Sequence, residues 1–331
     1  MASTVILSLD LGGTTLSGGL VQPDGRVRLQ RALPTFGQGR GRPVVEQLID
    51  MTAHLLDAAR QRRLTVAGIG AGVPGTVDIV RGRIRGNIHN VPELEGVALG
   101  PLLRRRFGLP VYLDNDVNAL ALGELYFGRA RGVRNFVMLA AGTGVGGGIV
   151  IDGRLIRGRR GYGGEAGHIT VNLDGRPCFC GSIGCMKAYA SGPDIAAQAR
   201  DRLQVSGPSR LLDLCGGNPA RLTAWEVFAA ARAGDPTALE VVETAARALG
   251  AGVANLVNLL NPELIILGGG VFEASDLLLP RIRRWAASYA FADALKGTRL
   301  VVSRFTKRSS IKGAAALFLY ETGPAPQSNR E

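Results

Sequence analysis

The chain has 331 residues and a formal net charge of +12, and 46% of its residues are hydrophobic while 20% are charged. This balance is typical of chains that bury apolar cores, and it excludes disordered and fibrous proteins. The 47 glycines follow no Gly-X-Y period, so they are expected at turns and close backbone contacts. A chain of this length is expected to form about two domains.

The positive charge comes mainly from arginine, because only four of the 39 basic residues are lysine. The denser arginine groups lie at residues 104–106, 154–160 and 281–284, without interleaved aromatic residues. An arginine-rich composition on solvated surfaces is therefore favoured over nucleic-acid binding, so no nucleic-acid partner is expected. Phosphate-bearing small molecules stay open as ligands.

The sequence shows no targeting or membrane-spanning segment. Residues 1–10 have neither a basic start nor a long apolar core, so they read as a strand rather than an export signal. The longest apolar run, residues 137–151, contains five glycines and is too short to cross a bilayer. We therefore expect a soluble, cytoplasmic protein with no membrane partner.

The first half is expected to begin with a strand, a turn, a strand and a hairpin. Apolar runs predict strands at residues 5–9 and 18–21, with a third strand starting at Arg26. The helical spacing of apolar side chains predicts a helix over residues 43–63. The elements expected next are a strand at 66–73, a helix at 99–107 and a strand at 110–113.

From residue 117 the same order of elements starts again. A helix to Tyr126 is followed by strands at 135–140 and 148–151 and by a hairpin at Asp152 and Gly153. Two related α/β halves with a cleft between them are therefore expected. The remaining predictions are helices at 191–203, 223–233 and 236–260, a strand at 264–267, a loop at 207–220 and a disordered tail at 324–331.

Two glycine turns follow predicted strands, one in each half. The first contains Asp10, Gly12, Gly13, Thr14 and Thr15, and it lacks the helix of a Walker loop or a dinucleotide fingerprint. Its backbone N–H groups and hydroxyls can approach phosphate oxygens, and Asp10 can orient a metal-bound water. The second turn contains Gly142, Thr143 and Gly144. Either turn alone is weak evidence of phosphate binding. Two such turns, one in each half of the chain, could hold a triphosphate from both sides.

Three consecutive polar residues, Asp114, Asn115 and Asp116, stand between a predicted strand and a predicted helix. An N-cap role explains one or two of them. A third polar residue is explained less well, and a carboxylate at the carboxyl end of a strand is suited to act as a general base.

His168, Cys178, Cys180 and Cys185 lie within a short stretch of chain. Three thiolates and one imidazole form a closed tetrahedral zinc site, which is structural because no coordination position stays open. Since Cys-x-Cys is tighter than the usual Cys-x-x-Cys, a buried thiol cluster without metal is the alternative.

Together these elements resemble the ROK sugar kinases (repressors, open reading frames and kinases) of the actin-like ATPase superfamily, from about residue 5 to residue 319. The motifs that carry the resemblance are Asp10-Leu-Gly-Gly-Thr, Gly72-Val-Pro-Gly75, Asn115-Asp116, Gly142-Thr-Gly-Val-Gly146, Glu165-x-x-His168 with the three-cysteine loop, and Leu267-Gly-Gly-Gly-Val271.

The resemblance implies an α/β fold of two ribonuclease-H-like, actin-like ATPase domains with a cleft between them. The smaller domain is expected at residues 1–112 plus about 300–322, the larger domain with the zinc loop at 113–299, and a tail at 323–331. A homodimer or homotetramer is also implied.

The implied activity is glucokinase-like, that is, ATP-dependent phosphorylation of a hexose hydroxyl, with the conversion of glucose to glucose 6-phosphate as the first choice. The implied cofactors are Mg²⁺, which accompanies ATP, and a structural Zn²⁺. Asp116 resembles the catalytic base. The implied sugar-binding residues are Gly75, Asn90, Asn115, Asp116, Glu165, His168 and Lys187. Both glycine turns fall where the family holds phosphates, and Gly268, Gly269 and Gly270 fall beside the adenosine.

Two positions depart from the family pattern. Thr15 replaces a usual lysine, which affects ATP binding little, and Lys187 replaces a usual sugar-binding glutamate, which leaves the sugar open. The ammonium of Lys187 is expected to alter the choice of sugar, to pair with Glu165 or to extend into water.

Several alternatives stay open. Other kinases would act on N-acetylmannosamine, N-acetylglucosamine, mannose or fructose, or would use polyphosphate as donor. A sugar-sensing repressor is disfavoured, because such proteins carry a winged helix before the first strand and only four residues precede it here. A sugar-binding protein without turnover is disfavoured by Asp116 and the two glycine turns.

Overall fold

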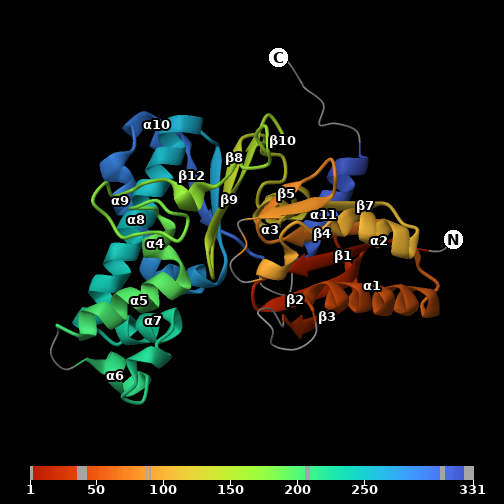
Figure 1. Cartoon of the computed structure of the whole chain (residues 1–331). Coiled ribbons are helices and arrows are strands. Elements are labelled where there is room, and N and C mark those ends of the chain that lie inside the picture. The colour runs from red at the N-terminus through yellow and green to blue at the C-terminus, as the bar shows by residue number, and fades with distance from the viewer. Residues whose placement is uncertain are drawn as a thin grey trace. The chain divides into compact units, whose positions relative to one another are not determined.

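The computed structural model describes residues 3–35, 43–86, 88, 91–205, 209–305 and 310–323 (Figure 1). Asn90 and the predicted tail lie outside the described residues. Contacts divide the chain into two compact units. The first consists of Met1–Met138, Gly148–Gly164 and Ser303–Glu331, and the second of Leu139–Gly147 and Glu165–Val302.

The first unit is built on a five-stranded sheet in the order β3-β2-β1-β4-β7. Its strands are β1 (Thr4–Leu11), β2 (Thr15–Val21), β3 (Val27–Pro34), β4 (Thr65–Val73) and β7 (Val111–Asn115). β1 pairs antiparallel with β2 and parallel with β4, and β4 pairs parallel with β7. The predicted strand, turn, strand order at the N-terminus is therefore present.

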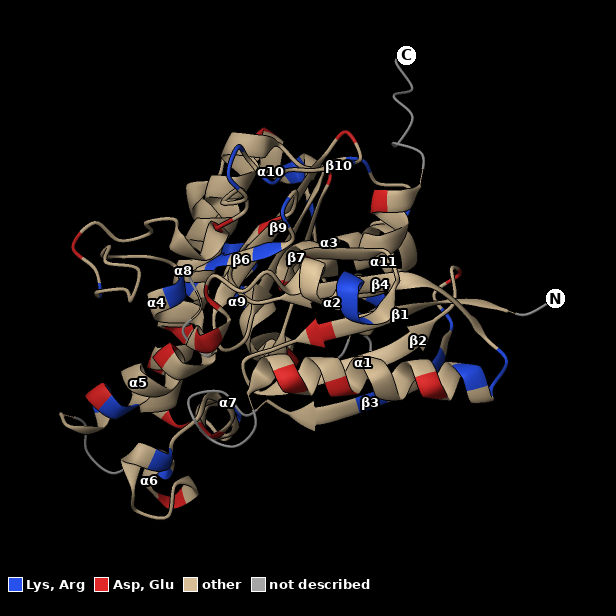
Figure 2. Ribbon diagram, turned by 45° about the vertical axis from the view of Figure 1, so that its right-hand side comes forward, with Lys and Arg blue, Asp and Glu red and all other residues tan. Residues whose placement is uncertain are grey.

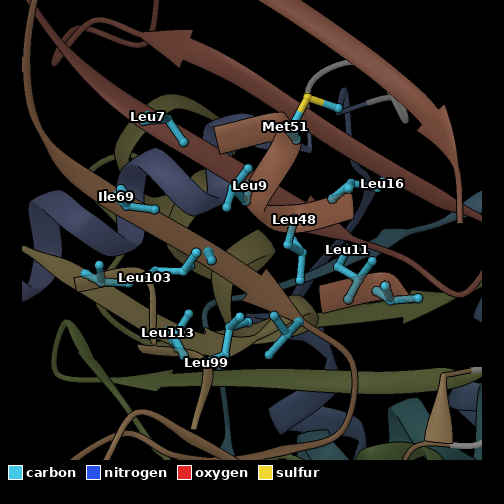
Figure 3. Close-up of a cluster of buried hydrophobic side chains, with 14 of the residues drawn as sticks. Leu7, Leu9, Leu11, Leu16, Leu48, Met51, Ile69, Leu99, Leu103 and Leu113 are labelled. Carbon is cyan, nitrogen blue, oxygen red and sulfur yellow. The ribbon is translucent and has the colours of Figure 1, made fainter. Parts of the chain in front are cut away.

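Helices cover both faces of this sheet. α1 (Val44–Gln61) and α2 (Leu99–Phe107) contribute Leu48, Met51, Leu99 and Leu103 to one buried cluster with the side chains of β1, β4 and β7 (Figure 3). α11 (Ile311–Thr322) and α3 (Asp116–Phe127) lie on the other face, where Ile311, Ala315 and Phe318 pack on Ile6 and Val21.

Glycine permits the close approach of α11. A Cβ at Gly70 in β4 would lie 1.9 Å from the Ala314 oxygen of α11, so only a glycine fits there. A two-stranded ribbon, β5 (Thr76–Asp78) and β6 (Arg83–Gly86), and the short helix η1 (Pro92–Leu94) complete the first unit.

The second sheet has the order β10-β9-β8-β11-β12. Its strands are β8 (Phe136–Ala141), β9 (Val145–Ile151), β10 (Arg154–Leu155), β11 (Leu264–Gly268) and β12 (Arg299–Val302). The chain passes from one unit to the other within β8 and β9. The short helix η2 (Ala166–His168) lies between β10 and the cysteine loop.

The other helices of the second unit follow the cysteine loop. They are α4 (Lys187–Ala190), α5 (Gly192–Leu203), α6 (Arg210–Leu214), η3 (Pro219–Arg221), α7 (Ala224–Arg232), α8 (Pro236–Leu260), η4 (Gly270–Ala274), α9 (Ser275–Tyr289) and α10 (Ala292–Gly297). α8 packs along α9, α7 and α5. No helix in the described part of the chain is long and apolar enough to cross a membrane.

The prediction of a loop at residues 207–220 is wrong for its described part. α6 forms there because Ser209 caps it by accepting a hydrogen bond from Leu211 N, and because Leu211 is fully buried. Gly216 and Gly217 adopt positive φ angles directly after the helix. These glycines end a helix rather than mark a long irregular loop.

The two units divide at other residues than the expected domains. Residues 113–138 and 148–164 belong to the first unit, although the expected boundary assigned them to the larger domain. The physical reason is backbone packing of α3 on α11, since a Cβ at Gly313 would lie 2.6 Å from the Ala119 oxygen. The start of the sequence repeat at residue 117 is therefore not the start of the second unit.

Basic and acidic residues lie on the same helices, for example α1 and α5, whereas α2 and β6 carry basic residues (Figure 2). This distribution agrees with arginine spread over solvated surfaces.

Candidate active site

Three parallel strands of the first unit bring polar groups to one edge of the sheet. Asp10 of β1 is in register with Gly72 of β4, and Gly72 is in register with Asp114 of β7. A Cβ at Gly72 would lie 3.3 Å from the Asp116 Cα and 3.6 Å from Asp10 Oδ1. Asp10 and Asp116 are thus neighbours at the carboxyl ends of parallel strands, where α/β proteins bind ligands.

Asn115 takes the N-cap role that the sequence left open. Its side-chain oxygen accepts hydrogen bonds from Val117 N at 2.9 Å and from Asn118 N at 3.3 Å. Its amide nitrogen donates to the Gly75 oxygen at 3.1 Å, which ties the start of α3 to the turn after β4. Asn115 is therefore the N-cap residue, and Asp116 at the first helical position also accepts a hydrogen bond from Val117 N through its Oδ1 at 2.9 Å.

Hydrogen bonds within the first glycine turn restrict what it can offer a phosphate. Gly12 N donates to the Thr15 oxygen at 2.8 Å, and Thr35 N donates to the Thr14 oxygen at 3.0 Å. The Thr35 hydroxyl also donates to the Gly12 oxygen at 3.0 Å. The Gly12 N–H is therefore already paired within the turn.

Burial raises the pKa of Asp10, and a hydrogen bond with the Ser310 side chain opposes that shift in part. A buried carboxylate is costly unless a cation is near. The Mg²⁺ that accompanies ATP would supply this charge, so Asp10 fits a place beside that ion.

In the second unit the other glycine turn meets two further elements. Gly142 N donates to the Gly144 oxygen at 2.8 Å, and the Gly142 oxygen accepts from Gly192 N, at the start of α5, at 2.8 Å. Gly269 has a φ of 89°, and a Cβ there would lie 2.3 Å from the Ala141 oxygen. The turns at 142–144 and 268–270 and the N-terminus of a 12-residue helix therefore converge, which favours phosphate binding.

The four predicted metal ligands form one cluster in the second unit. Their ligand atoms all lie within 4.8 Å of one another. His168 Nδ1 is 3.7 Å from Cys178 Sγ, and Cys180 Sγ is 3.7 Å from Cys185 Sγ. A tetrahedral zinc with Zn–S bonds of about 2.3 Å spaces its sulfurs about 3.8 Å apart, so the arrangement fits zinc.

The cysteines of this cluster need a cation when they are deprotonated to thiolates. Burial raises the pKa of Cys185 to about 12, and the neighbouring thiols Cys180 and Cys178 act in the same direction. Thiolates in this position are stable only beside a positive charge.

Gly167 places the Glu165–His168 turn directly on β9. A Cβ at Gly167 would lie 1.9 Å from the Val145 oxygen. Val145 follows the glycine turn at residues 142–144 in the chain, so Glu165, His168 and that turn belong to one contiguous part of the second unit.

Lys187 has a partner that the sequence analysis did not anticipate. Its Nζ lies 2.8 Å from Asp194 Oδ2 and 4.4 Å from the centre of the Phe179 ring. The side chain is 12% exposed, so the alternative of a lysine extended into water is wrong. Asp194 also contacts the hydroxyl of Ser191, the N-cap of α5.

The predicted site residues thus fall into two groups. Asp10, the turn at residues 12–15, Gly75, Asn115 and Asp116 belong to the first unit, and the turns at 142–144 and 268–270, Glu165, Lys187 and the metal ligands belong to the second. Sequence reasoning missed Thr35, Asp194 and Arg157, and the Arg157 guanidinium donates a hydrogen bond to Asp114 Oδ2 at 2.6 Å.

Comparison with known proteins agrees with this geometry. The ROK family model matches residues 6–321. A glucokinase from Thermotoga maritima is 33% identical over 323 residues, covering 98% of this chain and 100% of that protein. The structure of a ROK family glucokinase from Streptomyces griseus with glucose and AMPPNP has a TM-score of 0.81 at 32% identity, covering 95% of this chain and 98% of that one.

Regulators also share this fold. A ROK family transcriptional regulator, a homologue of the Escherichia coli MLC protein, has a TM-score of 0.83 at 32% identity, covering 95% of this chain and 78% of that one. These similarities confirm the predicted α/β fold with two actin-like ATPase domains.

Proposed function

Because the chain belongs to the ROK family, we propose that it is a glucokinase-like sugar kinase, which transfers the γ-phosphoryl group of ATP to a hexose hydroxyl, glucose first. One observation carries this proposal: Asp116 lies beside Asp10 at the carboxyl edge of parallel strands, while Asn115 caps the helix.

Asp116 acts as the general base in this proposal. It accepts the proton of the attacking sugar hydroxyl, whose oxygen forms a bond to the γ-phosphorus. The bond from that phosphorus to the β–γ bridging oxygen breaks, and ADP leaves. Phosphoryl transfer relies on positioning and charge neutralisation more than on covalent chemistry, so one aligned carboxylate and two phosphate-binding turns suffice.

ATP is held by the backbone-rich turns of both units. We assign Gly13, Thr14, Thr15, Thr143 and Gly144 to its phosphates, and Gly268–Gly270 to the adenosine. Asp10 would hold the Mg²⁺ of the nucleotide, which neutralises phosphate charge when bound.

The sugar is assigned to Gly75, Asn90, Asn115, Asp116, Glu165 and His168. His168 Nδ1 lies 3.7 Å from Cys178 Sγ, and we assign the other ring nitrogen, Nε2, to a sugar hydroxyl. We include Lys187 as a residue that tunes the choice of sugar, because it forms a salt bridge with Asp194 next to the cysteine loop.

A structural zinc would be bound by His168, Cys178, Cys180 and Cys185. When bound, this ion fixes the loop between His168 and Cys185 and, through the Glu165–His168 turn, the proposed sugar ligands.

The test is a coupled ADP-release assay over a panel of hexoses and amino sugars. Wild type should phosphorylate at least one hexose, and Asp116→Asn should lower kcat by about 10²–10⁴-fold while calorimetry still detects sugar binding. Asp293→Asn, at an exposed carboxylate, is the matched control and should keep the wild-type rate.

Each alternative gives another result. Turnover with polyphosphate but not ATP would reassign the donor, and sugar binding without turnover in wild type would favour a regulator. A cytoplasmic location and a dimer or tetramer also belong to the proposal, and light scattering of the purified chain measures the oligomeric state.

A further inference from the structure

A buried salt bridge lies one residue before the proposed sugar-binding and catalytic pair Asn115 and Asp116. Arg157 Nε donates to Asp114 Oδ2 at 2.6 Å. The Asp114 side chain is 3% exposed and the Arg157 side chain 15% exposed, so water screens this pair little.

The other oxygen of Asp114 holds the residues on both sides of Asp116. Asp114 Oδ1 accepts a hydrogen bond from Asn115 N at 2.7 Å and from Asn118 Nδ2 at 2.9 Å. The orientation of this carboxylate therefore fixes Asn115 before Asp116 and Asn118 after it.

Arg157 itself is fixed by one further helix of the first unit, α11, and by its own loop. Its second guanidinium nitrogen donates to Glu321 Oε1 on α11 at 2.5 Å, and its Cζ lies 5.6 Å from the centre of the Tyr320 ring. The Arg157 oxygen accepts from Gly163 N at 2.8 Å. One side chain thus links β7, α11 and the loop after β10, and α11 packs on α3 (Figure 1).

We propose that Arg157 is a positioning residue for phosphoryl transfer, acting through Asp114 to hold Asp116 in the geometry that proton transfer needs. Without the guanidinium, Asp114 would be a buried carboxylate with no ion-pair partner among the described residues. Its oxygens would then turn toward other donors, and this change releases Asn115 and Asn118. The inference rests on the proposed role of Asp116.

The experiment compares kcat and KM of five forms in the ADP-release assay: wild type, Arg157→Gln, Arg157→Lys, Asp114→Asn and the double variant Arg157→Gln/Asp114→Asn. Arg159→Gln is the control, since Arg159 is an exposed arginine of the same loop. A displacement of about 1 Å at a reacting group can cost about 100-fold. We expect Arg157→Gln to lower kcat about 10- to 100-fold, with smaller changes in the KM for the sugar and the KM for ATP. Arg157→Lys should lower kcat less than Arg157→Gln does.

The double variant separates positioning from a loss of contacts. Since the harm comes from an unpaired carboxylate, Asp114→Asn should restore much of the kcat that Arg157→Gln loses, so the two changes are not additive. If Arg157→Gln does not fold, Arg157→Lys and the double variant carry the test. Additive losses, or a kcat of Arg157→Gln equal to that of Arg159→Gln, would overturn the inference.

Asp116→Asn in the same assay keeps the two proposals distinct. A wild type without turnover, or an active Asp116→Asn, overturns the proposed function and this inference with it. An active wild type, an inactive Asp116→Asn and an unimpaired Arg157→Gln overturn only the role of Arg157.

Discussion

Gly167→Ala tests how closely the Glu165–His168 turn must approach β9. The added Cβ would lie 1.9 Å from the Val145 oxygen. Carbon and carbonyl oxygen ordinarily stay about 3.3 Å apart, so the two segments must separate by about 1.4 Å. Neither side can yield by a rotamer change, because the oxygen belongs to the backbone.

The expected magnitude follows from this overlap. Overpacking a buried position costs about 1–3 kcal/mol, and a contact with the backbone belongs at the upper end. A loss of about 3 kcal/mol should lower the Tm by about 6–12 °C in a domain of this size. The displaced turn carries Glu165 and His168, so kcat/KM for the sugar should also fall by about 100-fold.

The assay is thermal unfolding together with steady-state kinetics. Gly297→Ala is the control, because Gly297 ends α10 and a Cβ there meets nothing within 4 Å among the described residues. It should change the stability by about 0.5 kcal/mol or less. Equal Tm and kcat/KM values for the two variants would refute the role given to the Gly167 contact.

Three further predictions concern the metal, a helix cap and the sugar. Protein purified without chelator should contain one zinc per chain by elemental analysis, and Cys178→Ser should lower the zinc content and the Tm; a wild type without stoichiometric zinc contradicts the assignment. Asp235 is the N-cap of α8. Burial acts to raise its pKa, but hydrogen bonds from Ala238 N, the Ser209 hydroxyl and Arg210 N outweigh burial, so the pKa of Asp235 is lowered. The ionised cap stabilises the fold above the unfolded pKa of about 3.9, and this stabilisation is lost as the pH falls through the lower folded-state pKa. Asp235→Ala should therefore lower the free energy of unfolding by about 1–2 kcal/mol at pH 7 and by less below pH ~3.9. A difference between variant and wild type that stays constant down to pH ~2 would contradict this prediction. Lys187→Glu places a second carboxylate beside Asp194 and should lower the Tm. The charge-swapped double variant Lys187→Glu/Asp194→Lys should recover the Tm. If both variants phosphorylate the panel of sugars in the same order of preference as wild type, Lys187 does not belong to the sugar site.

Much of the first unit could be predicted, because its elements carry strong local signals. β1, β4 and β7 are apolar runs bounded by turn residues, and α1 has a clear apolar stripe. The place of Asp10 and Asp116 at one edge depends on the parallel pairing of β1, β4 and β7, which the sequence analysis did not predict. The four metal ligands were predicted as a cluster from their spacing alone, and the structure brings them together.

Elements that depend on tertiary packing could not be predicted in the same way. Pro280 stands inside α9, where a proline normally ends a helix, but Leu278 and Ile282 beside it are fully buried and hold the helix together. Arg157 was one arginine in a basic stretch, and its partners Asp114 and Glu321 are 43 and 164 residues away in the chain. Sequence spacing carries no information on such distant pairs.

The contribution of α11 to the first unit has a consequence for synthesis on the ribosome. The strands of that sheet are complete at Asn115, but the helix that covers Ile6 and Val21 begins at Ile311. At about 5–20 residues per second, translation needs about 10–40 s to travel that distance. For that interval one face of the first sheet lacks α11, so the nascent chain exposes an apolar surface that a chaperone can bind, and the first unit completes its core only after residues 311–322 have been made.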